Sequence, residues 1–403
     1  MNASSRLRII VLGYIVRGPL GGLAWHHLQY VLGLERLGHD VYFLEDSDDY
    51  PACYDPSQDA VGSDPTYGLA FAADAFGRLG LGTRWAYYDA HADKWHGAAI
   101  ERTRHACETA DLVINLSGVN PLREWVACVP GRAFVDTDPA FTQIRHLSDE
   151  RARKLAEQHT AFFTFGENIP TGLSAVPDDG FPWWSTRQPI VLDAWPVTPG
   201  PVNARYTTVM QWDSYPPREY GGRRFGMKSM SFSEFLKLPL CTNSKFELAL
   251  GSPGAPRDLL TGAGWHVRDP LEITRTPWTY QQYIEGSKAE FSVAKHGYVA
   301  IHSGWFSERS AAYLASGRPV LVQDTGFTEW LHADGGVLPF STLDEALDGI
   351  RLIDSDYKRQ CRIAREVAAE YFDANLVLPQ LIERCTQSVR PGAPGETGRV
   401  LHR

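Results

Sequence analysis

Residues 303–327 combine side chains suited to binding a phosphate group. Ser307 precedes a short helical pattern whose first turn, 308–310, holds a glutamate, an arginine and a serine. A helix N-terminus offers unpaired backbone N–H groups and about half a positive charge, and the arginine adds a full charge. The turn 324–327 follows the next apolar run, and its Gly326 lets the backbone approach a ligand closely. The segment therefore predicts a site for a nucleoside diphosphate.

A glycine-rich loop and two histidines form a second candidate site. The loop carries a G-x-x-G-G pattern that ends in Gly21 and Gly22, and His26 and His27 follow in a helical pattern. Histidine is the side chain best suited to accept a hydroxyl proton near neutral pH. Adjacent helical residues point in different directions, so we expect one histidine to face a ligand and the other to face the core or solvent.

These residues are positioned by alternating short strands and helices. An apolar run at 8–12, a helical period at 24–37 and a second apolar run at 41–44 form a strand–helix–strand unit. Such a unit needs a crossover between parallel strands, so we predict an α/β fold with parallel sheets covered by helices. Further strands are expected at 112–116, 133–135, 161–165, 190–192, 206–211, 246–250, 265–267, 291–293, 298–302 and 319–322, with helices at 280–287 and 344–353.

Polar residues follow several of the expected strands. In open α/β sheets, ligands bind beyond the carboxyl ends of the strands. The candidates on this ground are Asn120, Asp138, Glu167 and Asn168 in the first half, and Lys228 and Lys295 in the second half. The two lysines have the charge to neutralise phosphates, and the first four have the oxygen and nitrogen atoms to bind hydroxyl groups.

Two segments resemble a known family. The stretch RSAAYLASGRPV at 309–320, with QDTGF at 323–327, resembles the donor-binding segment of GT-B glycosyltransferases. It is most similar to the bacterial group with a spore-coat-protein-like glycosyltransferase C-terminal domain, and GGLAWHH at 21–27 with LGHDV at 37–41 resembles the opening of that group. The resemblance covers about residues 6–385. It implies a GT-B architecture, in which two Rossmann-like parallel-sheet domains face a cleft.

The resemblance also implies an activity: metal-independent transfer of a sugar from a nucleoside-diphosphate sugar to an acceptor hydroxyl or other nucleophile, without a cofactor. His26 or His27 is then the candidate base or the group that orients the sugar. The candidate donor-binding residues are Gly21, Gly22, Lys228, Lys295, Glu308, Arg309, Ser310, Asp324, Thr325, Gly326 and Phe327, and the acceptor-side candidates are Asn120, Asp138, Glu167 and Asn168.

One position departs from the family pattern. Many retaining GT-B enzymes hold the donor ribose with a glutamate five residues before the glycine of the small-x-Gly-x-Pro turn, and this chain has Ala312 there. Either Glu308 or Asp324 takes that role, or the ribose is held differently. The sugar, the base and the acceptor stay open.

The expected domain boundaries follow from length and composition. A chain of 403 residues exceeds one ordinary domain, and the stretch 176–201 is rich in Pro, Gly and Trp. We expect an N-terminal acceptor domain at 1–196 and a C-terminal nucleotide-sugar donor domain at 197–372. A last helix at 373–390 is expected to pack back on the first domain, and 391–403 to be a disordered tail.

Two other activities remain open on the sequence. Glu45 or Asp46, at the end of the second strand, imitates the ribose-binding acid of a nicotinamide-dependent oxidoreductase, although the G-x-G-x-x-G fingerprint is missing. A nucleotide-sugar epimerase would share the donor site and need no acceptor. The D-x-D pattern of metal-binding glycosyltransferases occurs three times, at 46–48, 136–138 and 354–356, so it is unspecific and we expect no metal.

Composition limits the partners. The formal net charge is −9, which argues against nucleic-acid binding through basic patches. The longest apolar run is about one strand long, whereas a membrane span needs roughly 20 residues, so we expect no integral membrane contact. The six cysteines contain no C-x-x-C pair and are expected to be reduced thiols of a cytoplasmic protein.

Overall fold

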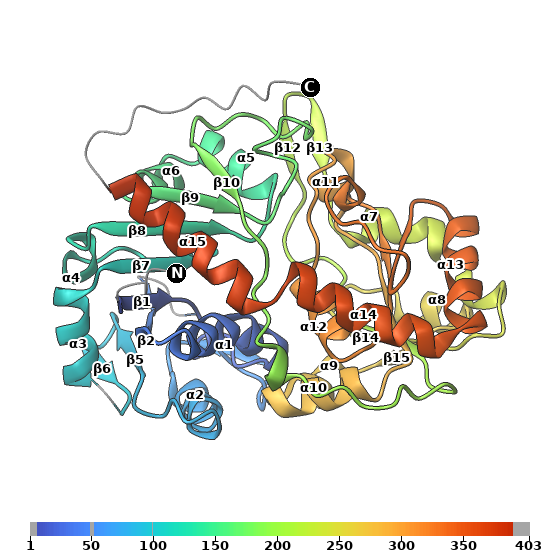
Figure 1. Ribbon diagram of the computed structural model, residues 1–403, viewed down its shortest axis with the longest axis horizontal. Coiled ribbons are helices and arrows are strands. Elements are labelled where there is room, and N and C mark those ends of the chain that lie inside the picture. The colour runs from blue at the N-terminus through green and yellow to red at the C-terminus, as the bar shows by residue number, and fades with distance from the viewer. Residues whose placement is uncertain (1–5, 49–51, 99, 390–403) are drawn as a thin grey trace.

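The computed structural model describes residues 6–48, 52–98 and 100–389, and two large sheets organise them (Figure 1). The strands of the N-terminal sheet are β1 (Arg8–Leu12), β2 (Asp40–Asp46), β5 (Trp85–Asp89), β6 (Lys94–His96), β7 (Leu112–Leu116), β8 (Gly131–Asp136), β9 (Ala161–Thr164) and β10 (Trp183–Ser185). Their order is β10-β9-β8-β7-β1-β2-β5-β6. Neighbouring strands are parallel from β10 to β5, and the edge strand β6 runs antiparallel to β5.

The C-terminal sheet is parallel throughout its six strands. These are β11 (Tyr206–Gln211), β14 (Phe246–Gly251), β15 (His266–Arg268), β16 (Ala289–Ser292), β17 (Val320–Gln323) and β18 (Val337–Phe340). Their order is β15-β14-β11-β16-β17-β18, so the first strand of this half lies at the centre, as β1 does in the other sheet. Two small antiparallel hairpins complete the strands: β3 (Cys53–Asp55) with β4 (Ala60–Gly62), and β12 (Arg218–Tyr220) with β13 (Arg223–Phe225).

Helices connect the strands and cover the sheets. They are α1 (Gly21–Arg36), α2 (Thr66–Arg78), α3 (Ile100–Thr109), α4 (Glu124–Ala127), α5 (Phe141–Ser148), α6 (Glu150–Glu157), α7 (Lys228–Phe232), α8 (Arg257–Gly262), α9 (Pro270–Thr274), α10 (Pro277–Glu285), α11 (His296–Ala300), α12 (Glu308–Ala315), α13 (Leu343–Ser355), α14 (Tyr357–Tyr371) and α15 (Ala374–Val389). Short 3-10 turns occur at Leu192–Ala194, Ser233–Phe235, Leu238–Leu240 and Phe327–Glu329. Among the described residues, none of these helices has the length and apolar character needed to cross a bilayer.

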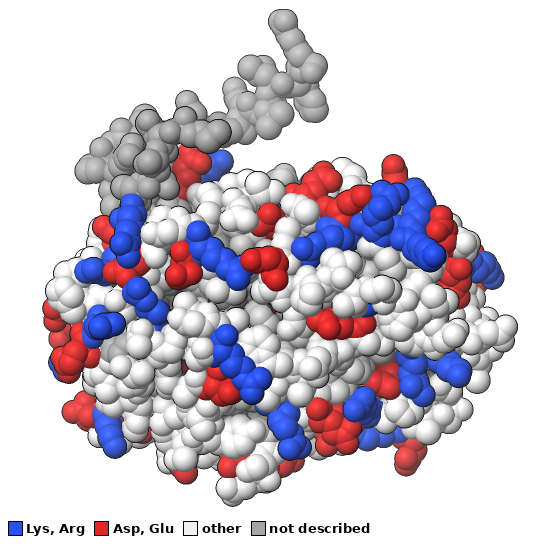
Figure 2. Space-filling view, turned by 60° about the horizontal axis from the view of Figure 1, so that its bottom comes forward, with Lys and Arg blue, Asp and Glu red and all other residues white. Residues whose placement is uncertain are grey.

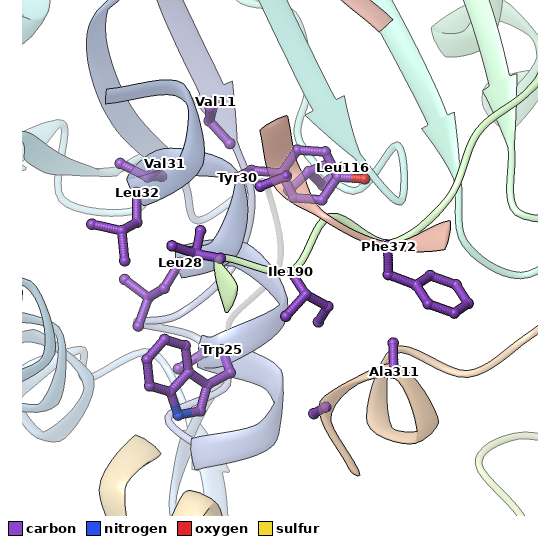
Figure 3. Packing of buried hydrophobic residues seen from close by; sticks show 14 of the residues in the cluster. Val11, Trp25, Leu28, Tyr30, Val31, Leu32, Leu116, Ile190, Ala311 and Phe372 are labelled. Carbon is purple, nitrogen blue, oxygen red and sulfur yellow. The ribbon is translucent and has the colours of Figure 1, made fainter. Parts of the chain in front are cut away.

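One hydrophobic cluster joins the two halves. It contains side chains of β1 and α1 from the N-terminal half together with side chains of α10, α12 and α14 from the C-terminal half. Phe372, in the link between α14 and α15, is fully buried in this cluster, and Ile190 lies between it and Leu28 of α1 (Figure 3). The last helix α15 then packs against α1, β8 and β9, so the described part of the chain finishes on the N-terminal half (Figure 1).

The strand–helix alternation follows the sequence pattern at most places, and two expected strands are wrong. Residues 298–302 lie mostly in the short helix α11, where Tyr298 and Ile301 pack against Phe141 from the other half. Residues 190–192 form no strand and make an isolated bridge to Asp373. The strands β5 and β18 were not expected. The tail at 391–403 lies outside the described residues.

Candidate active site in the cleft between the sheets

A cleft of about 690 Å³ opens where the carboxyl ends of both sheets meet. On the N-terminal side, the cleft is lined by residues that come directly after β1, β7 and β8 in the chain. On the C-terminal side, it is lined by the end of β11, residues after β16 and the start of α12. In each sheet the strand order reverses at these strands, β1 beside β7 and β11 beside β16. Ligands of open α/β sheets bind at such reversal points. The volume is also that of a small-molecule site, for which roughly 300–1,000 Å³ is usual.

The N-terminal wall contains strained backbone. Ser117, directly after β7, has φ 60°, and Ala140, directly before α5, has φ 73°. Such conformations are costly for residues other than glycine and persist where the surroundings impose them, often at functional sites. Here the Ser117 hydroxyl is hydrogen-bonded to that of Thr137 at 2.7 Å, which joins the ends of β7 and β8 at the edge of the cleft.

The start of α12 presents one fixed cation and one free carboxylate. Ser307 caps the helix by accepting a hydrogen bond from the Arg309 backbone N–H, as its position in the sequence predicts. The Arg309 guanidinium lies in the cleft wall but is held by the buried carboxylate of Glu290 at 2.6 Å and by Ser292 at 2.6 Å. Glu308 lines the cleft without a hydrogen bond or ion pair to the described residues. It is therefore the acid that is available to a ligand.

Three cations in the cleft have no counter-ion among the described residues: Lys228 at the start of α7, Arg145 in α5 and Arg218 in β12. The Nε of Arg145 is buried and has no hydrogen-bond partner. Burial, followed by the charge of Arg309, holds the pKa of Lys228 well below its usual range. A negatively charged ligand would restore it, so the cleft is built to receive anions although the chain is acidic.

Asp138 and Lys295 connect the two walls. The Lys295 ammonium donates to Asp138 at 2.8 Å and to the Tyr215 hydroxyl at 2.9 Å. The hydroxyls of Tyr215 and Tyr298 both donate to the same carboxylate. Asp138 and Lys295 both line the cleft, and their charges offset one another. Lys295 is therefore less available to a phosphate than Lys228.

The structure separates the two histidines. His26 lines the cleft beside Glu308, its Nε2 has no hydrogen-bond partner, and burial lowers its pKa. His27 is fully buried; its Nδ1 is bonded to the Leu23 carbonyl at 2.8 Å and its Nε2 accepts from the Tyr14 N–H at 3.2 Å. Both nitrogens of His27 are used in the neutral form, so His27 cannot reach a substrate. Of the pair, only His26 is placed for chemistry.

Several candidate residues hold the two halves together instead of lining the cleft. Gly21 packs on α10, where an added Cβ would lie 2.2 Å from the Thr276 carbonyl oxygen, and Gly22 packs on Tyr280. Asn168 is buried and donates to the carbonyls of His302 and Gly326 across the halves.

The remaining candidates are also occupied by structural contacts. Glu167 pairs with Arg187 at 2.5 Å, and Asn120 is buried and bonded to Asp46 N and Gly13 O. The turn 324–327 is closed on itself by Asp324, whose carboxylate accepts from the Gly326 N–H, and by Thr325, whose hydroxyl donates to the Trp305 carbonyl. Ser310 and Phe327 line a separate small cavity of about 10 Å³. Packing and hydrogen bonding thus use residues that the motif assigns to a ligand.

The nicotinamide alternative loses its ribose-binding acid. Glu45 is fully buried and accepts the backbone N–H groups of residues 15–17 at 2.5–2.8 Å, with Arg17 as its ion-pair partner. Asp46 accepts two hydrogen bonds from Arg123. Glu45 thus shapes the loop after β1, and Asp46 is held by Arg123. Asp136, the first acid of one D-x-D pattern, is likewise buried and bonded to Gln143 and Thr164. Within the described parts of the chain, no group of three His, Cys, Asp or Glu side chains is arranged to hold a metal ion.

Sequence reasoning missed two cations of the cleft, Arg145 and Arg218. Arg145 lies in the helix that follows the expected D-T-D turn, which is the only signal that could have found it. Arg218 lies in a hairpin that no periodic pattern of apolar residues predicts. Both positions need the fold before their convergence becomes visible.

No protein-family model matches the sequence, and no curated protein matches it. Solved structures are similar over nearly the whole chain. An α-glucosyltransferase in complex with UDP-glucose and DNA containing an abasic site has a TM-score of 0.58 at 10% identity, covering 95% of this chain and 100% of that chain. HepE of Anabaena in complex with UDP and glucose has a TM-score of 0.54 at 11% identity, with coverages of 94% and 100%. Sucrose-phosphate synthase from Thermosynechococcus elongatus has a TM-score of 0.52 at 11% identity, with coverages of 94% and 98%. The chain therefore has the GT-B glycosyltransferase fold, which confirms the expected architecture.

Proposed function

We propose that the protein is a glycosyltransferase that moves a sugar from a nucleoside-diphosphate sugar to an acceptor. The observation that carries this proposal is the set of unpaired groups in the cleft of a GT-B fold: Lys228, Glu308 and His26. Similar structures, HepE in complex with UDP-glucose among them, support a UDP-sugar as the donor. Within GT-B enzymes, the motif at 309–327 supports the bacterial group with a spore-coat-protein-like C-terminal domain.

The arrangement suggests a mechanism in which the protein's own charges replace a metal. The diphosphate binds at Lys228 and the N-terminus of α12, where the ammonium and the helix dipole stabilise the charge of the leaving group. Glu308 accepts hydrogen bonds from hydroxyl groups of the ribose or the sugar. It lies one turn before Ala312, the position of the usual ribose-binding glutamate, on the same helix. Transfer breaks the bond between the anomeric carbon and the phosphate oxygen and joins that carbon to the acceptor oxygen. The acceptor proton passes to His26, whose lowered pKa keeps the ring neutral, with one nitrogen unprotonated, at neutral pH.

The proposal assigns the N-terminal half, residues 1–196, to the acceptor and residues 197–372 to the donor. The acceptor is a small molecule in this proposal. Four similar structures of an α-glucosyltransferase contain DNA, but this chain carries a net charge of −9, and acidic and basic side chains are interspersed over the face shown in Figure 2. A bacterial, cytoplasmic setting is also part of the proposal, supported by six free cysteines.

Nucleoside-diphosphate binding tests the donor site directly. Titration calorimetry would compare UDP, GDP and dTDP, without metal and with Mn²⁺, on the wild type and on Lys228→Ala. We expect one diphosphate to bind without metal and the variant to bind it roughly 10- to 100-fold more weakly, because one charge-assisted contact is lost. Lys237→Ala is the matched control. Lys237 is exposed, lies outside the cleft and has no side-chain partner among the described residues, so this variant should bind like the wild type.

Lys228 serves this test better than Arg309, because Arg309→Ala would leave the buried Glu290 carboxylate without its counter-ion. Binding of NADH or NADPH alone, equally strong in wild type and Lys228→Ala, would overturn the glycosyltransferase proposal. Product analysis without any acceptor separates the epimerase alternative, since an epimerase converts the nucleotide sugar alone.

A further inference from the structure

Two of the unpaired cations come from opposite walls of the cleft. Arg145 belongs to α5 of the N-terminal half and Arg218 to β12 of the C-terminal half, and these two elements pack against each other. Both arginines line the cleft next to Tyr215, whose hydroxyl pKa they lower against the raising effects of burial and Asp138. Neither guanidinium has a hydrogen bond or ion pair with a described side chain.

This pair adjoins the place proposed for the diphosphate, because Lys295 acts on Lys228 and also donates to Tyr215. The charges that act on Lys228 are those of Arg309, Glu290, Lys295 and Glu308, all from the C-terminal half. Arg145 and Arg218 instead lie around Tyr215 at the junction of the two halves. One cleft thus offers two cationic places, and a single diphosphate needs only one of them.

The buried Nε of Arg145 calls for an acceptor atom. A guanidinium cannot lose its proton in a protein, so a buried N–H without a partner carries its full desolvation penalty. Asp138, which lines the same cleft, makes no hydrogen bond to Arg145 among the described contacts, and its carboxylate accepts instead from Lys295, Tyr215 and Tyr298. A planar guanidinium matches the two oxygens of a phosphate or carboxylate group, which is the chemistry that this pair lacks.

We infer that the acceptor substrate carries an oxyanion group, a phosphate monoester or a carboxylate, which Arg145 and Arg218 bind from the two walls of the cleft. The inference rests on the proposed function for the meaning of the second site. It places the neutral, reacting part of the acceptor toward His26 and Glu308, which line the same cleft. Because one arginine comes from each half, binding of the acceptor would also draw the two halves together.

The test measures a second anion on the UDP complex. With UDP saturating, titration calorimetry would follow inorganic phosphate in one arm and acetate in the other, on wild type, Arg145→Gln and Arg218→Gln. Arg102→Gln, an exposed arginine of α3, is the matched control. We expect one of the two anions to bind the wild-type UDP complex and the control equally, and each cleft variant to weaken that anion at least 10-fold. The affinity for UDP itself should change less than threefold. Phosphate binding identifies a phosphate monoester and acetate binding a carboxylate.

The outcomes separate the two proposals. If UDP binds but neither anion does, or if both cleft variants bind the anion like the wild type, the anionic acceptor is overturned while the donor site stands. If none of UDP, GDP and dTDP binds the wild type, the proposed function fails instead, and the same anion titrations on the free protein still show whether the arginine pair is a site. Melting curves and UDP affinity report whether a variant is folded, and Arg218, on the β12–β13 hairpin, provides the variant that perturbs the core least.

A transfer assay extends the result to turnover. Sugar phosphates and sugar acids would be compared with their uncharged parent sugars as acceptors, with UDP release as the readout. We expect Arg145→Gln to raise KM for the charged acceptor at least 10-fold, whereas Arg102→Gln should keep the wild-type KM. Equal use of charged and uncharged acceptors by the wild type would contradict the inference.

Discussion

At the scale of the residue, burial decides which of two identical side chains can do chemistry. His26 and His27 are neighbours, yet only His26 lines the cleft, and its Nε2 has no hydrogen-bond partner among the described residues. We predict that His26→Gln lowers kcat by at least 100-fold, the usual loss when a general base is removed, and changes the melting temperature little. His27→Gln should lower the melting temperature, because the ring packs on Gly13 and bonds to Leu23. Steady-state UDP release and calorimetric melting measure the two effects.

The pH dependence of the activity also tests His26 as the base. Burial lowers the pKa of His26 below its ordinary value of 6.5, so the base stays neutral and active above that pH. On the acid side, activity should therefore fall only as the pH drops through this lowered pKa, and it should not rise through pH 7. A profile of kcat/KM that rises through pH 7, or a His26→Gln variant that keeps the wild-type profile, would remove His26 from the role of base.

At the scale of the element, the glycine-rich start of α1 packs on the neighbouring helix α10. An alanine at position 21 would place its Cβ 2.2 Å from the Thr276 carbonyl oxygen. We predict that Gly21→Ala lowers the free energy of unfolding by about 1–3 kcal/mol, as overpacking does. Gly77→Ala in α2, where nothing lies within 4 Å of the added Cβ, should raise it by about 0.5 kcal/mol. Denaturant unfolding of the two variants tests this, and equal effects would show that the contact between α1 and α10 is unimportant.

The strands and helices also show which features of the structure the sequence can predict and which it cannot. Apolar runs predicted the buried central strands β1 and β7 well, because most of their residues are apolar. Residues 298–302 have the same apolar character but form α11, since their burial comes from packing against Phe141 across the halves and not from a sheet. For the site, local patterns predicted the cap of α12 and the cleft position of Lys228. They could not predict Arg145 with Arg218, because that pair exists only after two distant segments meet.

At the scale of the whole molecule, the two sheets share a core. Side chains from α1 and α12 belong to one hydrophobic cluster, and Phe372 is stacked on Phe306 within it at 5.2 Å. Removing a buried phenylalanine ring costs about 3–5 kcal/mol. Because Phe372 contributes to the junction of the two halves, its loss weakens the coupling between them as well as the fold.

We therefore predict one cooperative thermal transition for the wild type and two separated transitions for Phe372→Ala. Phe235→Ala is the matched control, since Phe235 is equally buried but packs on Phe291 and Phe340 inside the C-terminal half. It should move the single transition to lower temperature without dividing it, because the junction stays intact. Differential scanning calorimetry distinguishes these cases. Two transitions already in the wild type would mean that residues 1–196 and 197–372 are independent units, and the cleft between them would then close only when substrates join its two walls.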